Sequence, residues 1–291
     1  MLAIGIDVGG TSVKVAAVDG HRTLWTGRSR TYERPTTQQV VTAIKEAAAD
    51  RAGDAILAGI CVPGLLNEDR TAVKLSINIP GLMGIRLDEL VRSALADGVR
   101  LACVSSDAVA SAYDLQVSRA LKGRLFCLAI GTGVGAAVLD DGQALKVHGD
   151  SPGHFGQIDV SIEGEPVIGP DGGAGGMEGY LGAAALSRRY GKDFSQKFEQ
   201  IKVNDPPIKA LVRAIRIGHA IYCPDHVGLS GGIGIRIGHL LPEIHHAVCT
   251  NLTRITKSGW TFVIGDSDYH AAIGAAKMVL ASWEATGRGR R

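Results

Sequence analysis

The sequence predicts an α/β protein of two lobes around a central cleft, and three observations support this prediction. A pattern of strand, glycine turn, strand and Asp-Gly turn occurs at residues 3–20 and again at residues 126–142. After each copy, segments with helical periodicity alternate with short apolar runs typical of buried strands. Glycine contributes 39 of 291 residues with no collagen period, against a usual share of about 7%. The matching order of features favours an internal duplication over two unrelated hairpins.

The two hairpins are the clearest elements. Residues 3–20 read AIGIDVGGTSVKVAAVDG, an apolar strand, a Gly-Gly turn, a second strand carrying Val13, Val15 and Val18, and a closing Asp-Gly turn. Residues 126–142 read FCLAIGTGVGAAVLDDG and repeat that order. Gly-rich and Asp-Gly turns between apolar alternating segments are strong hairpin signals. We therefore expect a β-hairpin to open each lobe.

The remaining elements follow from periodicity. Apolar runs predict strands at residues 55–64, 99–104 and 260–264, the first ending in a Pro-Gly loop. Helical spacing predicts helices at residues 37–49, 87–95, 107–119, 180–189, 207–222, 238–253 and 268–283. Residues 149–179 are Gly-rich and aperiodic, which predicts a long functional loop. We expect a first lobe at residues 1–115, a second at 116–267, and a C-terminal helix at about 268–284 that packs back on the first.

Composition excludes several functional classes. The 31 basic and 29 acidic side chains nearly cancel, so no broad positive field favours nucleic acid. The five cysteines are dispersed and show neither disulfide nor metal spacing, which is typical of buried thiols in a reducing cytosol. The longest strongly apolar run, residues 125–139, contains three glycines and is shorter than the roughly 20 residues that span a bilayer. We therefore expect a soluble cytoplasmic protein with no membrane partner.

The first glycine turn has the composition of a phosphate site. Residues 5–14 read GIDVGGTSVK, in which Gly9 and Gly10 allow backbone N–H groups to approach phosphate oxygens. Thr11 adds a hydroxyl donor and Lys14 a positive charge. Asp7 is a carboxylate suited to orienting the water shell of Mg²⁺. The same turn can also be purely structural.

Two further glycine clusters extend this prediction. Gly131, Thr132 and Gly133 form the turn of the second hairpin and predict a second phosphate clamp. Gly231 and Gly232 end an apolar segment and open a helix, where a flat base can lie on bare backbone. A plain strand-to-helix turn explains this last cluster about equally well.

These motifs carry a resemblance to a known family. IGIDVGGTSVKVAAVD, CVPGLLNED, SINIPGLMG, SSDAVASAYD, AIGTGVGAAVLDDG, VGLSGGIG and AAIGAAKMV resemble, in order over nearly all of residues 3–280, the signatures of the ROK family of sugar kinases and sugar-responsive repressors. The resemblance implies two ribonuclease H-like lobes of the actin-like ATPase/hexokinase fold, with ATP and Mg²⁺ as cofactors, a sugar as substrate, and a homodimer. By the same likeness, Asp107 matches the catalytic aspartate.

The residues themselves also support that role for Asp107. It follows a predicted strand and begins a predicted helix, where the helix dipole favours an ionised carboxylate. Such a carboxylate can accept the proton of a sugar hydroxyl as that hydroxyl attacks the γ-phosphate. Asp107 can equally be a helix cap, and both roles are compatible.

The resemblance also assigns the sugar site, with departures. Sugar contacts fall on Gly64, Asn78, Ser106 and Glu178, although the family usually has Asn at the position of Ser106. The family pattern Glu-x-Gly-His reads here His154-Phe155-Gly156-Gln157, so a carboxylate and a zinc-binding histidine are both replaced. His154 can contact a sugar or be a solvated loop histidine.

The family's zinc cysteines are replaced as well. The three cysteines match Gly169, Asp171 and Gly176, and no thiolate remains to complete a tetrahedral zinc site. We therefore expect no structural zinc. The loop must then be held by packing and hydrogen bonds.

Three functional hypotheses follow. The first is an ATP-dependent kinase for a hexose or hexose derivative, with polyphosphate as an alternative donor. The second is a sugar- or nucleotide-binding regulator with weak catalysis, which the altered loop permits. The third is a family repressor, but the first phosphate motif starts at Ala3, which leaves no room before it for a DNA-binding domain.

Overall fold

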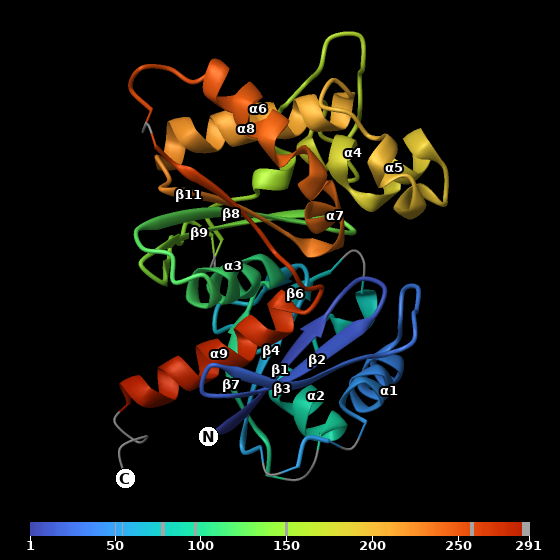
Figure 1. Ribbon diagram of the computed structural model, residues 1–291. Helices are drawn as coiled ribbons and strands as arrows, with labels where there is room; N and C mark the ends of the chain where they lie inside the picture. The colour runs from blue at the N-terminus through green and yellow to red at the C-terminus, as the bar shows by residue number, and fades with distance from the viewer. Residues whose placement is uncertain are drawn as a thin grey trace. The chain divides into compact units, whose positions relative to one another are not determined.

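A computed structural model describes residues 1–49, 51–53, 55–76, 79–95, 98–148, 151–256 and 259–286. The chain forms two compact units (Figure 1). The first comprises residues 1–118 together with the C-terminal segment from residue 269, and the second comprises residues 119–268. Within the described residues, no helix has the length and apolar character needed to cross a membrane.

The first unit is a five-stranded sheet in the order β3-β2-β1-β4-β7. β1 pairs antiparallel with β2 and parallel with β4, which pairs parallel with β7. Its strands and helices are β1 (Leu2–Val8), β2 (Val13–Asp19), β3 (Arg22–Arg28), α1 (Thr37–Ala48), β4 (Leu57–Cys61), β5 (Leu65–Leu66), β6 (Val73–Leu75), the 3₁₀ turn Pro80–Leu82, α2 (Leu87–Ala94), β7 (Arg100–Ser105), α3 (Asp107–Ser118) and α9 (His270–Ala285).

The two faces of this sheet carry side chains of different size. Ile4, Ile6 and Val8 pack with α1 and α2 in a large apolar cluster. On the opposite face, Ala3 and its small neighbours meet α9. Gly5 is required there, because a Cβ at this position would lie 1.8 Å from the carbonyl oxygen of Ala272 on α9. Small residues on one face thus let the C-terminal helix lie directly on the sheet.

The second unit repeats the topology with the order β10-β9-β8-β11-β12. β8 pairs antiparallel with β9 and parallel with β11, which pairs parallel with β12. Its elements are β8 (Arg124–Ile130), β9 (Val134–Asp140), β10 (Gln143–Ala144), α4 (Met177–Leu181), α5 (Ala183–Tyr190), α6 (Pro206–Tyr222), β11 (His226–Ser230), α7 (Gly231–Arg236), α8 (Leu241–Thr250), β12 (Thr261–Ile264) and 3₁₀ turns at Phe155–Gln157, Phe194–Gln196, Phe198–Gln200 and Ile237–Leu240.

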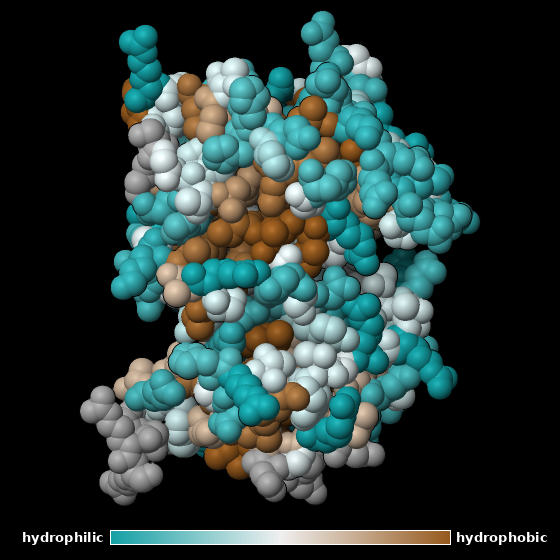
Figure 2. Space-filling view, viewed as in Figure 1, coloured by the Kyte–Doolittle hydropathy of each residue, from teal (hydrophilic) through white to brown (hydrophobic). Residues whose placement is uncertain are grey.

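One apolar cluster fills this unit. It joins β8 and β9 to α4, α6 and α8, and Phe126 lies 4.9 Å from Phe155 between ring centroids. Figure 2 shows apolar residues gathered around β8 and β11, whereas the region of α5 shows mainly hydrophilic residues. The identical strand order in both units is what a duplicated hairpin-led module would produce.

Two predicted helices are wrong in detail. The helix predicted at residues 180–189 is interrupted at Gly182, where a Cβ would lie 2.9 Å from the carbonyl oxygen of Glu178. The helix predicted at residues 238–253 is a 3₁₀ turn followed by α8, which has proline at its start. The outer strands β3 and β10 were not predicted.

Candidate functional site

The first glycine turn joins β1 to β2 and is held from outside. The N–H of Gly9 donates to the carbonyl of Ser12 at 3.0 Å, and the hydroxyl of Tyr32 donates to the carbonyl of Gly9 at 2.6 Å. The N–H of Tyr32 donates to the carbonyl of Thr11 at 2.9 Å. Among the described residues, no protein acceptor receives the N–H of Gly10 or Thr11. The turn thus keeps two donors available for an anion.

Asp7 and Lys14 lie opposite each other where this hairpin ends. Asp7 is 6% exposed, and its Oδ2 lies 3.5 Å from Nζ of Lys14. Burial raises the pKa of Asp7, and the positive charge and hydrogen bond of Lys14 partly oppose this effect. A buried carboxylate balanced by a lysine suits a hydrated divalent cation.

Asp107 reaches the same edge of the sheet through β7. Asp7 is in register with Cys61, and Cys61 with Ser105, because β1, β4 and β7 run parallel. Ser106 and Asp107 follow directly at the carboxyl end of β7, and Asp107 is the first residue of α3. Carboxyl ends of parallel strands are the usual ligand edge of open α/β sheets.

The capping role at α3 falls to Ser106. Its Oγ accepts the N–H of Val109 at 3.3 Å, and its carbonyl accepts the N–H of Ala110 at 3.1 Å. One carboxylate oxygen of Asp107 accepts the N–H of Ala108 at 2.8 Å. The side chain of Asp107 is therefore fixed by the helix start without serving as its cap.

The surroundings of Asp107 raise the pKa of its carboxyl group. Asp107 is exposed to solvent, but many protein atoms surround its carboxyl group and partly desolvate it. This desolvation, followed by the negative charge of Asp7, raises the pKa of Asp107 to about 6. Such a carboxylate is ionised near neutral pH but more basic than an ordinary aspartate.

Two predicted sugar contacts follow β4. Gly64 has φ +102°, and a Cβ there would lie 2.1 Å from the carbonyl oxygen of Leu75, so only glycine fits. Asn78 lies outside the described residues.

The second glycine turn joins β8 to β9. The N–H of Gly131 donates to the carbonyl of Gly133 at 2.9 Å, and the N–H of Ala183 lies 3.1 Å from the carbonyls of Gly131 and Thr132. Within the described part of the chain, the N–H groups of Thr132 and Gly133 have no protein acceptor. This turn therefore also presents two open donors.

Glu178, on the first turn of α4, contacts this second glycine turn. Its Oε2 accepts the N–H of Val134 at 3.0 Å and would lie 2.8 Å from a Cβ at Gly133. Partial burial raises the pKa of Glu178, an effect that the Val134 hydrogen bond reduces. A predicted sugar ligand and a predicted phosphate turn are thereby adjacent.

Gly231 and Gly232 open α7 at the carboxyl end of β11, the neighbour of β8. Gly231 has φ +78°, and a Cβ there would lie 2.5 Å from the carbonyl oxygen of Ile130. The side chain of Arg236 donates to the carbonyl of Gly232 at 2.6 Å. The two predicted glycine sites of this unit share one sheet edge.

The altered loop is ordered by its own backbone. His154 and Gln157 are exposed on either side of buried Phe155. Where the zinc cysteines would be, the N–H of Gly169 donates to the carbonyl of Gly173 at 2.7 Å. The hydroxyl of Tyr180 donates to the carbonyl of Glu165 at 2.7 Å. Across the described ranges, no group of three or more His, Cys, Asp or Glu side chains is arranged to hold a metal.

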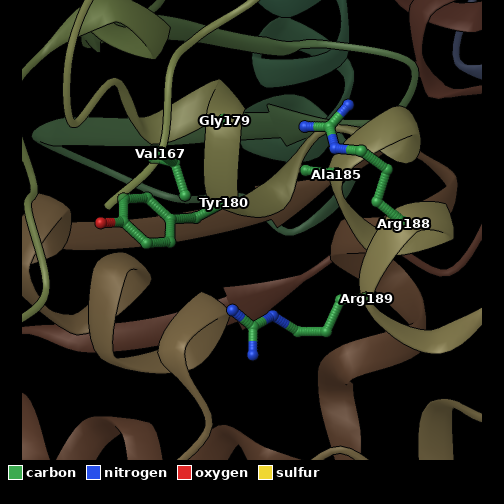
Figure 3. A pocket seen from close by; sticks show the side chains of 6 residues that line it. All are labelled: Val167, Gly179, Tyr180, Ala185, Arg188 and Arg189. Carbon is green, nitrogen blue, oxygen red and sulfur yellow. The ribbon is translucent and has the colours of Figure 1, made fainter. Parts of the chain in front are cut away.

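A shallow cavity of about 340 Å³ lies beside α4 and α5 in the second unit (Figure 3). Figure 3 shows Tyr180 on one side, with the Arg188 and Arg189 side chains extending from α5. Arg189 is paired with Glu165 at 2.5 Å. None of the predicted site residues lines this cavity.

Sequence reasoning missed two residues that shape the site. Tyr32 holds the first glycine turn, and the backbone of Ala183 holds the second. Each lies far along the chain from the turn it supports, so no local spacing signals the contact.

Comparison with known proteins connects this geometry to a family. The model described as "ROK family" matches residues 3–282. The N-acetylmannosamine kinase of Vibrio cholerae is 23% identical over 259 residues, covering 82% of this chain and 87% of that protein. A ROK family glucokinase from Streptomyces griseus, solved with glucose and AMPPNP, superposes with a TM-score of 0.74 at 19% identity, covering 96% of this chain and 99% of that one.

A second solved structure has the same fold. The inorganic polyphosphate/ATP-glucomannokinase of an Arthrobacter strain gives a TM-score of 0.66 at 21% identity, covering 97% of this chain and 99% of that one. These likenesses confirm the predicted fold class, two ribonuclease H-like α/β units of the actin-like ATPase/hexokinase kind.

Proposed function

The chain belongs to the ROK family, and from that premise we propose that it is an ATP-dependent kinase that phosphorylates a hydroxyl of a hexose or hexose derivative. The observation that carries the proposal is the place of Asp107. It begins α3 at the carboxyl edge of the sheet that also bears Asp7 and the first glycine turn. A carboxylate at the start of a helix, on the same sheet edge as a glycine turn that can bind phosphate, is suited to act as the base in phosphoryl transfer.

Asp107 acts in this proposal as the general base. Its carboxylate accepts the proton of the attacking sugar hydroxyl while the hydroxyl oxygen bonds to the γ-phosphorus and the bond to the ADP oxygen breaks. With a pKa of about 6, the group is roughly nine-tenths ionised at pH 7. The hydrogen bond from Ala108 orients one oxygen, leaving the other for the substrate.

Backbone donors bind the phosphates. The N–H groups of Gly10 and Thr11 in the first unit, and of Thr132 and Gly133 in the second, are suited to phosphate oxygens. The Thr11 hydroxyl and Lys14 add further contacts in the first unit, and Gly231 and Gly232 offer bare backbone in the second.

Asp7 fits a role beside Mg²⁺. Its buried carboxylate, 3.5 Å from Lys14, can accept hydrogen bonds from the ion's water shell. The ion would neutralise phosphate charge during transfer.

The sugar is held in this proposal by Gly64, Asn78, Ser106 and Glu178, with His154 and Gln157 replacing the usual carboxylate and histidine. Because those replacements remove an anionic hydrogen-bond acceptor, each sugar hydroxyl left without a partner should cost about 1 to 3 kcal/mol. We therefore propose a modified or differently configured hexose over plain glucose. The Vibrio cholerae relative, named for N-acetylmannosamine, is consistent with that class.

A catalytically weak sugar- or nucleotide-binding regulator is the second candidate. The changed loop at His154 and Gln157 favours it, because loss of sugar contacts lowers turnover before it abolishes binding. The working form in this proposal is a homodimer, as the resemblance implies, and it is cytoplasmic, as the composition suggests. The five cysteines are dispersed along the chain without disulfide spacing, which fits a reducing compartment.

A donor and acceptor panel tests the proposal. Purified protein is incubated with Mg²⁺, either ATP or polyphosphate, and glucose, mannose, N-acetylglucosamine or N-acetylmannosamine, and the sugar phosphate formed is quantified. We expect transfer from ATP to at least one modified hexose and poor transfer to glucose. Efficient glucose turnover would overturn the substrate proposal, and sugar binding without turnover on any acceptor would support the regulator.

A further inference from the structure

Three titratable side chains are buried together where α3 meets α9. Oδ2 of Asp114 lies 2.6 Å from Nδ1 of His270, and Oδ1 of Asp114 lies 2.5 Å from Nζ of Lys277. The exposed fractions of the three residues are 2%, 4% and 7%. Such a cluster in an interior of small apolar residues requires partners for every charge.

Between the two partners on α9, the helix backbones touch. Gly274 lies midway between His270 and Lys277, and a Cβ at Gly274 would lie 1.8 Å from the carbonyl oxygen of Ala110 on α3. α9 also lies on β1, where Gly5 allows the approach of Ala272. A single helix therefore contacts both the strand that carries Asp7 and the helix that begins with Asp107.

The spacing along α3 connects this cluster to the proposed base. Asp114 follows Asp107 by seven residues, which is two helical turns and about 10 Å along the axis, so both lie on similar faces. We propose that Asp114, held by His270 and Lys277, is a positioning residue that fixes α3 against α9 and thereby sets where the Asp107 carboxylate stands. This inference rests on the proposed kinase function.

The hydrogen bonds of Asp114 are needed to fix α3 against α9, because the apolar contacts between these helices do not set their relative position. The buried residues on the first turns of α3 are mainly small, among them Ala108, Ala110 and Ala112. Small side chains allow close approach but do not interlock along the helix axis. The Asp114 carboxylate accepts hydrogen bonds from two positions on α9 and so fixes the position of α3 along α9. Fixing a register is the best supported use of buried polar groups.

Two double variants separate the hydrogen bond from the charge. Asp114→Asn with Lys277→Met carries no buried ion pair but can keep a hydrogen bond to His270. Asp114→Leu with Lys277→Met removes both, so neither variant carries the ion pair and only the Asn form can hydrogen-bond to His270. We expect the Leu form to show kcat about tenfold to a hundredfold below the Asn form. The KM values for sugar and ATP should stay within about twofold, since no proposed ligand contact is removed.

Amide exchange tests the coupling without relying on catalysis. The N–H groups of Val109 and Ala110 bond to Ser106 at the start of α3. These amides should exchange about tenfold faster in the Leu form than in the Asn form. Amides of β8 in the second unit serve as the internal control and should not change.

The outcomes distinguish the two proposals. If the parent protein phosphorylates no sugar, the proposed function fails, and the exchange rates still decide whether the cluster holds α3. Equal exchange and equal kcat in the two double variants would overturn the positioning role. Should either double variant not fold, His270→Gln, which can still donate to Asp114, is compared with His270→Leu, with the same order expected.

Discussion

Replacing His219 should make the protein more tolerant of acid. His219 lies on α6 with no exposed surface, and its ring centroid is 4.6 Å from that of Trp260. Within the described residues, neither ring nitrogen has a hydrogen-bond partner. Burial, followed by the nearby His245, lowers the pKa of His219 to about 4.

The magnitude follows from linkage between protonation and folding. The unfolded chain binds a proton on this imidazole near pH 6.5, whereas the folded protein does so only near pH 4. The contribution to stability is therefore complete above pH 6.5 and is lost as the pH falls toward 4. At pH 5 the loss amounts to roughly 2 kcal/mol.

Urea unfolding at pH 7.5 and pH 5 measures this effect. His219→Leu has a similar side-chain volume and no titrating group, so its free energy of unfolding should fall by about 2 kcal/mol less than that of the parent between the two pH values. His246→Leu, at an exposed position on the neighbouring α8, should leave the parent's pH difference unchanged. Identical pH dependence in the parent and His219→Leu would refute the reasoning.

Three other predictions concern packing, pH and metal. Gly274→Ala places a Cβ 1.8 Å from the backbone of Ala110, so it should lower the melting temperature strongly, whereas Gly173→Ala, which meets no atom within 4 Å, should change it little; equal melting would contradict the close helix contact. Since Asp107 must be ionised and its pKa is about 6, kcat/KM should rise with pH through that value, and a profile flat from pH 5 to 7 would argue against this base. Metal analysis of protein purified without chelators should find far less than one zinc per chain, and stoichiometric zinc would show that ligands were misassigned.

The hairpins could be read from the sequence because their signals are local. In residues 3–20 and 126–142, apolar strands flank glycine turns, and the observed pairs β1–β2 and β8–β9 overlap these ranges, beginning one and two residues earlier. The outer strand β3 has no fully buried residue and its pairing with β2 contains a register shift, so its pattern was not distinctive.

The break at Gly182 depended on a contact distant in sequence. The helical periodicity of the sequence continues across Gly182. In the structure, a Cβ added at Gly182 would lie 3.2 Å from the carbonyl oxygen of Thr132. Thr132 lies fifty residues earlier in the chain, so the local spacing of apolar residues cannot indicate this contact. The support that Tyr32 gives to the first glycine turn escaped prediction for the same reason.

The sequence predicted where site residues lie along the helices and strands better than it predicted which groups surround them. The placement of Asp107 at a helix start followed from the strand end before it and agrees with α3 beginning there. The cap on Ser106, the raised pKa of Asp107 and the contact of Glu178 with the second glycine turn all need three-dimensional neighbours.

The most direct test of the account compares the parent with Asp107→Asn. Both are assayed with ATP, Mg²⁺ and the best sugar acceptor, and the sugar phosphate is quantified while circular dichroism confirms an unchanged fold. The parent should transfer phosphate, and the variant, which keeps the shape but not the basicity of the side chain, should lose on the order of 10² to 10⁴ in kcat. Full turnover by a folded Asp107→Asn protein would contradict the assignment of the base.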